Sequence, residues 1–362
     1  MGYSETEARQ LVIKAGYELV EKGLIARTWG NISARIGYNK FVITPSGRDY
    51  MSLKPEDLVV VDLDGNYEGS IKPSSEKGVH AQTYRLRNNV NFVIHTHQCN
   101  ASALSIIGKN IPLGEGISDE TKAILGPKIV CAEYGLSSTK KLSNAVACAI
   151  EENPECNHVL MRYHGAVCFG KDYDSAFKVA FTLEALSGKI FEHYVGEKIL
   201  TEPNTINKLE LTQLIPELSQ VIEVEDGADT KVVYQNDYEE MVILHAKTPY
   251  ITKISELGEK MLPYSDDMAQ IAGPIIYCAS ENASFEEIEK RRGKDSAIFI
   301  KGNGAYCYGI NEEEANAVIM VLEKACQAAY LARKKNVSAL KIPGAVLERI
   351  IYQKKYSKLK DK

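Results

Sequence analysis

The sequence predicts an α/β fold in which a mixed, largely antiparallel sheet carries helices on its faces. Two observations predict this class. Short β-branched runs alternate along the chain with stretches whose apolar residues recur at helical spacing. Many of the strands are joined by tight turns, whereas a doubly wound parallel sheet needs a long crossover after each strand. The 362 residues are enough for two domains and a substantial core.

The first predicted element is an amphipathic helix that begins at Ser4 and ends at Gly23. Ser4 and Glu7 form a capping-box pattern, and glycine is a typical residue to end a helix. Three strand runs follow, NISARI, KFVITPSG and LVVVDLDG, and then a helix over residues 76–87. The run NFVIHTH at residues 91–97 is short, apolar and β-branched, which predicts a buried strand.

The rest of the first half continues this alternation, and the pattern loosens after Gly196. The stretch that follows mixes one short helix with polar and acidic segments, which is typical of a connector. Between the predicted strand at 91–97 and this connector we expect a helix over residues 100–107, a strand in KIVCAEY and a helix over residues 138–152 capped by Ser137 or Ser138. Two strands in HVLMRYHGAVCFG and a helix over residues 172–194 follow.

The second half repeats part of the first. Residues 158–186 align without gaps on residues 297–325, and KIVCA and FVIHTHQ have echoes in PIIYCA and VILHAKT. The recurring residues include two pairs of cysteines, which we interpret as packing residues. Among the recurring pairs are Gly165 with Gly304, Ala166 with Ala305, Cys131 with Cys278, Cys168 with Cys307, and Glu184 with Glu323.

The histidines of the first copy are mostly lost from the second. His95 corresponds to His245, His97 to Lys247, and His164 to Asn303. A packed core would survive in a decaying copy, whereas a metal site released from use would lose its ligands. We therefore expect four parts: a first domain at 1–198 with the site, a connector at 199–238, a degenerate partial repeat without metal ligands at 239–335, and a basic tail at 336–362.

The composition excludes several classes of protein. The net charge is −5 with both signs mixed along the chain, which argues against a nucleic-acid-binding surface. No apolar run is long enough to cross a bilayer, and the first residues lack the pattern of a signal peptide. The eight cysteines form no CxxC pair, which is typical of reduced thiols and predicts a cytoplasmic protein with no nucleic-acid or membrane partner.

Two histidines one residue apart end the strand predicted at 91–97. Alternate residues of a strand point to the same side, so His95 and His97 can bind one metal ion, or they can be two surface histidines. His164 lies in a turn between two apolar runs, where a buried structural histidine has no evident purpose. Three imidazoles leave coordination positions open, which is typical of a catalytic metal site.

Three short polar stretches have no evident structural role in a sheet protein: TWGNIS at 28–33, TPSG at 44–47 and PSSE at 73–76. Small hydroxyls, a side-chain amide and glycine amides bind phosphate without many cations. Each stretch could also be a turn or a cap, and PSSE could cap the helix that begins near Glu76. Their order together with HTH and YHG favours a phosphate-binding role.

The ordered motifs TxGNxS, TPSG, PSSE, HTH and YHG, within residues 5–195, resemble the class II aldolase/adducin family, most closely its L-fuculose-1-phosphate-type sugar-phosphate aldolases. The resemblance implies a three-layer α/β/α sandwich and a homo-oligomer with active sites at subunit contacts. It implies that His95, His97 and His164 bind Zn²⁺, or another divalent metal such as Mn²⁺, Co²⁺ or Fe²⁺, and that Glu76 is the catalytic acid/base. The implied phosphate-binding residues are Thr28, Asn31, Ser46, Gly47, Ser74 and Ser75.

The resemblance also implies a reaction. A ketose 1-phosphate of the fuculose, rhamnulose, ribulose or deoxyribulose type would be cleaved to dihydroxyacetone phosphate and an aldehyde through a metal-stabilised enediolate. A sugar-phosphate 4-epimerase, dehydratase or decarboxylase on the same metal site is the alternative, and a non-catalytic adducin-like interaction module is a remote one. The family's aldolases use a further tyrosine from a neighbouring subunit, and here Gly116 stands at that place, so this role is unassigned.

Two further expectations concern His80 and the second copy. His80 lies one turn after Glu76 on the same helix face, where it is either a partner of the site or, as we favour, a surface histidine. The second copy is expected to occupy the place of a neighbouring subunit, which would reduce a tetramer to a dimer. Light scattering that shows a simple four-fold tetramer would contradict this expectation.

Overall fold

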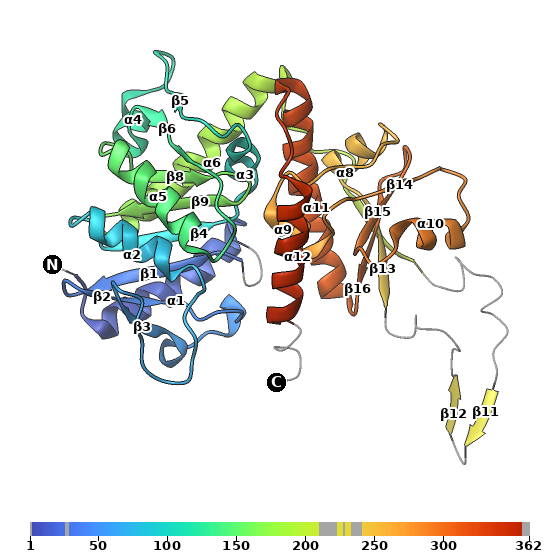
Figure 1. Cartoon of the computed structure of the whole chain (residues 1–362), viewed down its shortest axis with the longest axis horizontal. Helices are drawn as coiled ribbons and strands as arrows, with labels where there is room; N and C mark the ends of the chain where they lie inside the picture. Colours follow the sequence, from blue (N-terminus) through green and yellow to red (C-terminus); the bar gives the residue numbers. More distant parts are fainter. Residues whose placement is uncertain (1, 26–28, 210–222, 227–228, 233–240, 357–362) are drawn as a thin grey trace. The chain divides into compact units, whose positions relative to one another are not determined.

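The computed structural model describes residues 2–25, 29–209, 223–226, 229–232 and 241–356 of the chain (Figure 1). The chain forms two compact units. The first comprises Met1–Ile199, Leu331–Ser338 and Gln353–Lys362, and the second comprises Leu200–Tyr330 and Ala339–Tyr352. No helix within the described residues is long and apolar enough to cross a membrane.

The first unit is built around a seven-stranded sheet in the order β3-β2-β1-β4-β9-β8-β7. Only β7 and β8 run parallel within this sheet and the other neighbouring strands are antiparallel, so the predicted mixed, largely antiparallel sheet is confirmed. Its strands are β1 (Asn31–Ile36), β2 (Lys40–Ile43), β3 (Val59–Asp62), β4 (Phe92–Thr96), β7 (Cys131–Ala132), β8 (His158–Met161) and β9 (Gly165–Gly170), and a separate ribbon pairs β5 (Ile111–Pro112) with β6 (Lys128–Ile129).

Helices cover both faces of this sheet, which confirms the three layers. α2 (Lys77–Leu86) and α5 (Lys140–Glu152) share a core with Val93 of β4 on one face. On the other face Phe92 contacts Tyr173, with ring centroids 5.3 Å apart. That face carries α1 (Glu5–Glu21), α3 (Cys99–Ser105) and α6 (Tyr173–Val195), and α4 (Asp119–Leu125) packs on α6. Because successive strand residues alternate between faces, His95 shares the face of Val93, which α2 covers.

Side chains cap the starts of α1 and α5. Ser4 caps α1 by accepting a hydrogen bond from the backbone of Glu7, as predicted. The predicted cap of α5 was wrong, because Thr139 and neither Ser137 nor Ser138 accepts the capping hydrogen bond. Ser138 instead adopts a left-handed backbone conformation with φ of 63°. Such a conformation is uncommon for a residue with a side chain and points to a local constraint.

The second unit contains a five-stranded sheet in the order β10-β13-β16-β15-β14. The register of its ladders matches that of the first unit, because Ala246 pairs with Ala305 as Thr96 pairs with Ala166. The strands are β10 (Thr205–Leu209), β13 (Val242–Lys247), β14 (Cys278–Ala279), β15 (Ala297–Ile300) and β16 (Ala305–Gly309). Each therefore corresponds to one strand of the series β1-β4-β9-β8-β7, and the predicted repeat of the fold is confirmed.

The helices of the repeat follow the same order. α8 (Pro249–Ser255), α9 (Asp266–Ile271), α10 (Phe285–Arg292) and α11 (Glu312–Lys335) stand in the chain where α3, α4, α5 and α6 stand in the first copy. The described part of the second unit contains no counterpart of α2 before β13. A hairpin of β11 (Glu223–Asp226) and β12 (Asp229–Val232) lies in that stretch of the chain.

Two segments differ from the sequence expectation. Residues 205–209, expected in the connector, form β10, in which Asn207 pairs with His245 as Asn31 pairs with His95. The expected basic tail contains a final helix, α12 (Ile342–Tyr356), whose Glu348 is buried and accepts a hydrogen bond from Gln270. A short helix was also expected within the connector, and residues 210–222 of that stretch lie outside the described residues.

Candidate metal centre

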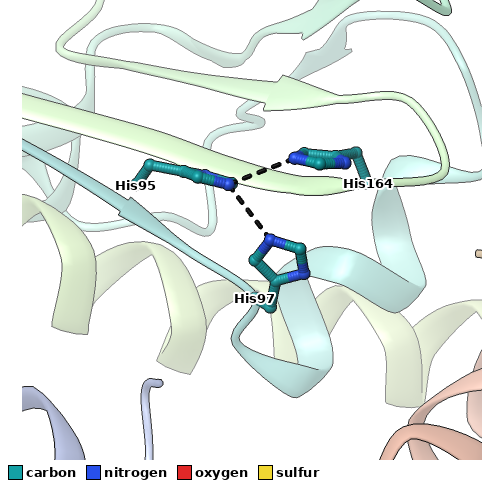
Figure 2. A group of neighbouring side chains, drawn as sticks. All are labelled: His95, His97 and His164. Carbon is teal, nitrogen blue, oxygen red and sulfur yellow. Dashed lines mark hydrogen bonds between the residues drawn. The ribbon is translucent and has the colours of Figure 1, made fainter. Parts of the chain in front are cut away.

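Three imidazoles converge at one end of β4 in the first unit. The Nε2 atom of His95 lies 3.1 Å from Nε2 of His97 and 3.1 Å from Nε2 of His164, and Figure 2 shows the three rings turned towards a common point. His95 and His164 are buried, and His97 is partly exposed. Nitrogen ligands bound about 2.0–2.1 Å from a tetrahedral zinc ion lie about 3.3 Å apart. The separations therefore suit a single metal ion.

A backbone carbonyl sets the tautomer of His95. Its Nδ1 lies 2.9 Å from the carbonyl oxygen of Ala166, the residue that pairs with Thr96 across β4 and β9. A carbonyl oxygen only accepts, so Nδ1 must carry the proton, and in a neutral ring Nε2 then presents its lone pair to the centre. This is the arrangement that a histidine needs to act as a metal ligand.

The turn between β8 and β9 delivers His164. Tyr163, immediately before it, has φ of 62°, and the Tyr163 hydroxyl donates a hydrogen bond to the carbonyl oxygen of Ser338 over 2.8 Å. Gly165, immediately after it, has no room for a side chain, because a Cβ atom there would lie 2.3 Å from the carbonyl oxygen of Thr96. The turn is therefore held tightly on both sides of the histidine.

Glu76, at the start of α2, completes the centre. Its Oε2 lies 3.1 Å from Nε2 of His95, and its Oε1 lies 3.2 Å from Nε2 of His164. The carboxylate is buried, which by itself raises its pKa, but attraction and hydrogen bonds to His164 and His95 outweigh burial and hold the pKa well below its usual range. Glu76 is therefore an ionised carboxylate beside the three imidazoles.

The donor set of this centre fits a divalent metal. The Nε2 atoms of the three histidines and the carboxylate oxygens of Glu76 lie close together, so a positive charge is needed among them, supplied either by protons on the rings or by a bound cation. Three histidines and one carboxylate are ligand types that zinc and similar cations accept. Among the described residues, His95, His97 and His164 are the one group of histidine, cysteine or acidic side chains close enough to hold a metal.

Asn31 and His80 stand beside Glu76 rather than at the protein surface. The Asn31 side-chain amide donates to Glu76 Oε2 over 3.3 Å, and its oxygen lies 2.5 Å from His80 Nε2. His80 is fully buried, so the favoured interpretation as a surface histidine was wrong. In the sequence, His80 stands between the apolar residues Val79 and Ala81. Helical spacing alone does not show that the sheet covers the His80 side chain.

The two loops expected to bind phosphate lie side by side next to Glu76. Pro45 and Pro73 form a bridge, and the backbone of Ser74 donates to the carbonyl oxygen of Thr44 over 3.0 Å. The Ser74 hydroxyl accepts from the Glu76 backbone N–H over 3.2 Å, so it also orders the start of α2. Of the remaining predicted residues, Ser46, Gly47 and Ser75 are partly exposed along these loops, and Thr28 lies outside the described residues.

Ser138 is a site residue that the sequence analysis did not predict. Its backbone N–H donates to Glu76 Oε1 over 3.4 Å, and its hydroxyl donates to Ser75 over 2.8 Å. The left-handed backbone of Ser138 aims both groups at the site, which accounts for the constraint noted above. Its neighbours in the sequence, SSTK, look like an ordinary helix start, so only the fold shows the contact.

The corresponding place in the second unit is arranged differently. His245 Nε2 lies 2.6 Å from the carbonyl oxygen of Asn303, the residue that aligns with His164. Lys247 stands in the register of His97 and offers a cation instead of a ligand. The His245 nitrogen that corresponds to the metal-facing nitrogen of His95 is therefore engaged in a hydrogen bond to the backbone.

Comparison with known proteins shows the family of the chain. The sequence model of the family described as "Class II Aldolase and Adducin N-terminal domain" matches residues 10–188 and 231–330, which is more than half of the chain. The second matched segment covers the repeat, so both halves are related to the same domain.

Individual relatives match about half of the chain and most of their own length. A 5-deoxy-D-ribulose 1-phosphate aldolase of Bacillus thuringiensis serovar kurstaki is 32% identical over 211 residues, covering 57% of this chain and 92% of the relative. An L-fuculose phosphate aldolase of Methanocaldococcus jannaschii is 35% identical over 172 residues, covering 48% and 89%. A solved L-fuculose 1-phosphate aldolase shares 32% identity over 53% of this chain and 89% of its own, with a TM-score of 0.48. The family match shows that the chain belongs to the class II aldolase and adducin family.

Proposed function

We propose that this chain is a divalent-metal-dependent aldolase that cleaves a ketose 1-phosphate to dihydroxyacetone phosphate and an aldehyde. The observation that carries the proposal is the buried carboxylate of Glu76, which lies 3.1 Å from His95 and 3.2 Å from His164 of the metal centre. Relatives named for 5-deoxyribulose 1-phosphate and fuculose phosphate support a ketose 1-phosphate as the substrate class.

His95, His97 and His164 would hold the metal, and zinc is our first choice because three neutral imidazoles with open positions are typical of catalytic zinc. When bound, the cation supplies Lewis-acid stabilisation of the negative charge that develops on the substrate oxygens. The protein's own contribution is to orient these ligands, through Ala166 for His95 and through the constrained turn for His164.

Glu76 carries the proton chemistry in this proposal. Cleavage removes the proton of the C4 hydroxyl, breaks the C3–C4 bond and leaves its electron pair on the C2–C3 fragment, which gains a proton at C3 to become dihydroxyacetone phosphate. We assign the delivery of that proton to Glu76: its carboxylate would first take up a proton from solvent, release it to C3 and return to the ionised form, while the C4 hydroxyl proton leaves through a group that is still unassigned. Gly116 has no side chain to act on the C4 hydroxyl, so this second role stays unassigned.

The paired loops are our proposed phosphate site. Ser46, Gly47, Ser74 and Ser75 present hydroxyls and backbone amides close to Glu76, and such groups bind phosphate without a cluster of cations. Holding the phosphate at a distance from the breaking bond would orient the sugar. The Asn31 side chain contacts Glu76 and His80, so we propose that it serves the carboxylate rather than the phosphate.

The first experiment is the release of dihydroxyacetone phosphate from fuculose, rhamnulose, ribulose and 5-deoxyribulose 1-phosphates by zinc-loaded protein. We expect release from at least one of them, and loss of release in His97→Ala. Glu76→Gln should keep its zinc and lose about 10²- to 10⁴-fold in kcat, the usual contribution of a positioned acid or base. A zinc-loaded parent protein that releases none, but converts a pentulose phosphate to its C4 epimer, would contradict the aldolase proposal.

The assembly and location of the protein are proposals as well. We propose a cytoplasmic homo-oligomer, since the family resemblance implies active sites at subunit contacts and none of the eight cysteines forms a disulfide. Light scattering of the full chain measures the oligomeric state directly.

A further inference from the structure

A continuous chain of buried hydrogen bonds leads away from Glu76 between the sheet and α2. Its five members are at most 8% exposed, and three of them are fully buried. The proposed reaction uses only the first member. The links are Glu76 Oε2 to Asn31 Nδ2 at 3.3 Å, Asn31 Oδ1 to His80 Nε2 at 2.5 Å, His80 Nδ1 to Ser33 Oγ at 2.6 Å, and Ser33 Oγ to the Tyr84 hydroxyl at 2.8 Å.

The chemistry of the groups gives this chain one direction. The NH₂ group of Asn31 donates to Glu76 Oε2, so its amide oxygen faces His80. His80 must then donate from Nε2, and a neutral ring is left with a lone pair on Nδ1 that accepts the Ser33 hydroxyl proton. The Ser33 oxygen in turn accepts from Tyr84. Each donor therefore points along the chain towards the carboxylate.

His80 is the member that fixes this direction. It lies one turn along α2 from Glu76, its ring stacks on Phe41 with an interplanar angle of 15°, and no part of it is exposed. Burial lowers its pKa to about 3, so it stays neutral and keeps one donor and one acceptor. If the Asn31 amide rotated by half a turn, its NH₂ group would face the donor of His80 and its oxygen would face Glu76. Both contacts would be repulsive.

The strand of the second unit that corresponds to β1 differs from it at one member of this chain. Asn207 occupies the register of Asn31, but Leu209 occupies that of Ser33. Leucine can therefore occupy this strand position in the second unit.

We propose that His80 is a positioning residue for Glu76, acting through Asn31 to hold Oε2 of the carboxylate against the metal centre. The inference rests on the proposed function, in which Glu76 moves a proton. It assigns to His80 no contact with the substrate or the metal. Its effect on the reaction must therefore depend on the presence of the Glu76 carboxylate.

A double-mutant cycle on the zinc-loaded full chain tests this dependence. We expect His80→Leu to lower kcat about 10- to 100-fold, as changes beside catalytic ligands do, and to leave KM within about twofold. In a Glu76→Gln background the same change should lower kcat by less than about twofold, because the residue through which it acts is already altered. His80→Gln keeps an N–H that can reach Asn31, and we expect it to recover most of the lost kcat.

His158 provides a matched control. It is also a fully buried neutral histidine of the first unit, and its Nε2 accepts from the backbone of Val130 at the far end of β8 from His164. His158→Leu removes a buried imidazole without touching the chain, so kcat should stay near that of the parent. Should His80→Leu fail to fold, Ser33→Ala removes the donor to His80 Nδ1 together with the acceptor of the Tyr84 hydroxyl, and its smaller loss of kcat should likewise vanish in the Glu76→Gln background.

Two results would overturn the inference. One is a parent-like kcat in folded His80→Leu, and the other is an equal loss in the parent and Glu76→Gln backgrounds. A parent that cleaves no ketose 1-phosphate would refute the proposed function instead, and the visible spectrum of cobalt-loaded protein without substrate then decides about His80. His80→Leu should shift the spectrum towards that of Glu76→Gln, while His80→Gln should match the parent. A His80→Leu spectrum identical to that of the parent would refute the positioning role.

Discussion

The two units of this chain carry the same five-stranded arrangement with different residues at its functional end (Figure 1). The features that packing requires persist in both. Glu184 accepts from the backbone N–H groups of Asn100 and Ala101 at the start of α3, and Glu323 accepts from those of Tyr250 and Ile251 at the start of α8. Such carboxylates satisfy amides that a helix leaves unpaired.

At the end of the sheet where the three histidines lie in the first unit, the residues differ between the two units. His164 becomes Asn303 and His97 becomes Lys247, while His245 remains and bonds to the carbonyl oxygen of Asn303. A histidine that lost its neighbouring ligands could stay because a backbone acceptor was within reach. The helix-capping carboxylates therefore recur in both units, whereas among the described residues the cluster of three histidines occurs only in the first.

The largest expected effect comes from replacing His164 of the first unit by asparagine, the residue found at Asn303 of the second unit. We expect His164→Asn to remove stoichiometric zinc and to lower dihydroxyacetone phosphate release on the order of 10³-fold, since two imidazoles remain. His245→Ala is the matched change in the second unit and should alter neither. Metal analysis by mass spectrometry measures both variants, and zinc lost from His245→Ala would show that the second unit contributes to the metal site.

A smaller effect tests the shared scaffold. Glu184→Ala and Glu323→Ala should each destabilise their own unit by about 2 kcal/mol, because each leaves two partly buried backbone N–H groups without their acceptor. Denaturant unfolding gives the size of the effect, and hydrogen exchange of peptides over 99–105 and 249–255 gives its place. If only one of the two substitutions loosens its helix, the two carboxylates are not equivalent.

The smallest expected effect concerns acid stability. His158 in β8 is fully buried, and Ala297 stands at the same register in the second unit. Burial lowers the pKa of His158 to about 4 from an unfolded value of 6.5, so the unfolded chain binds more protons between these values. The free energy of unfolding therefore falls as the pH decreases through this window, by about 2 kcal/mol at pH 5.

His158→Leu should remove this part of the acid sensitivity. Urea unfolding at pH 7 and at pH 5 would show a smaller difference between the two pH values for the variant than for the parent. An unchanged difference would mean that other groups account for the acid sensitivity of the first unit.

Much of the architecture could be predicted because it depends on local patterns. Ser4 caps α1 through a residue three positions away, and the strand before His95 follows from a short apolar run. The repeat was visible because glycine, cysteine and glutamate positions recur at constant spacing, and the three histidines stood out because the second copy lacks two of them. The structure then brought those three together as expected.

Other features depend on partners far apart in the sequence. β10 is polar and exposed along most of its length, and it is a strand only because β13 pairs with it. Ser138 reads as part of a helix start, yet the fold turns its amide towards Glu76, 62 residues earlier. The same is true of His80, whose surroundings come from β1 and β2.

By itself, the sequence determined the α/β class, the duplicated scaffold and the identity of three converging imidazoles, because periodic burial and repeated spacing are written along the chain. Only the tertiary structure decided which side chains hold Glu76 in place. Asn31, His80 and Ser138 act across strands and loops, and the value of a hydrogen bond at these positions depends on which distant donor or acceptor shares the same buried space.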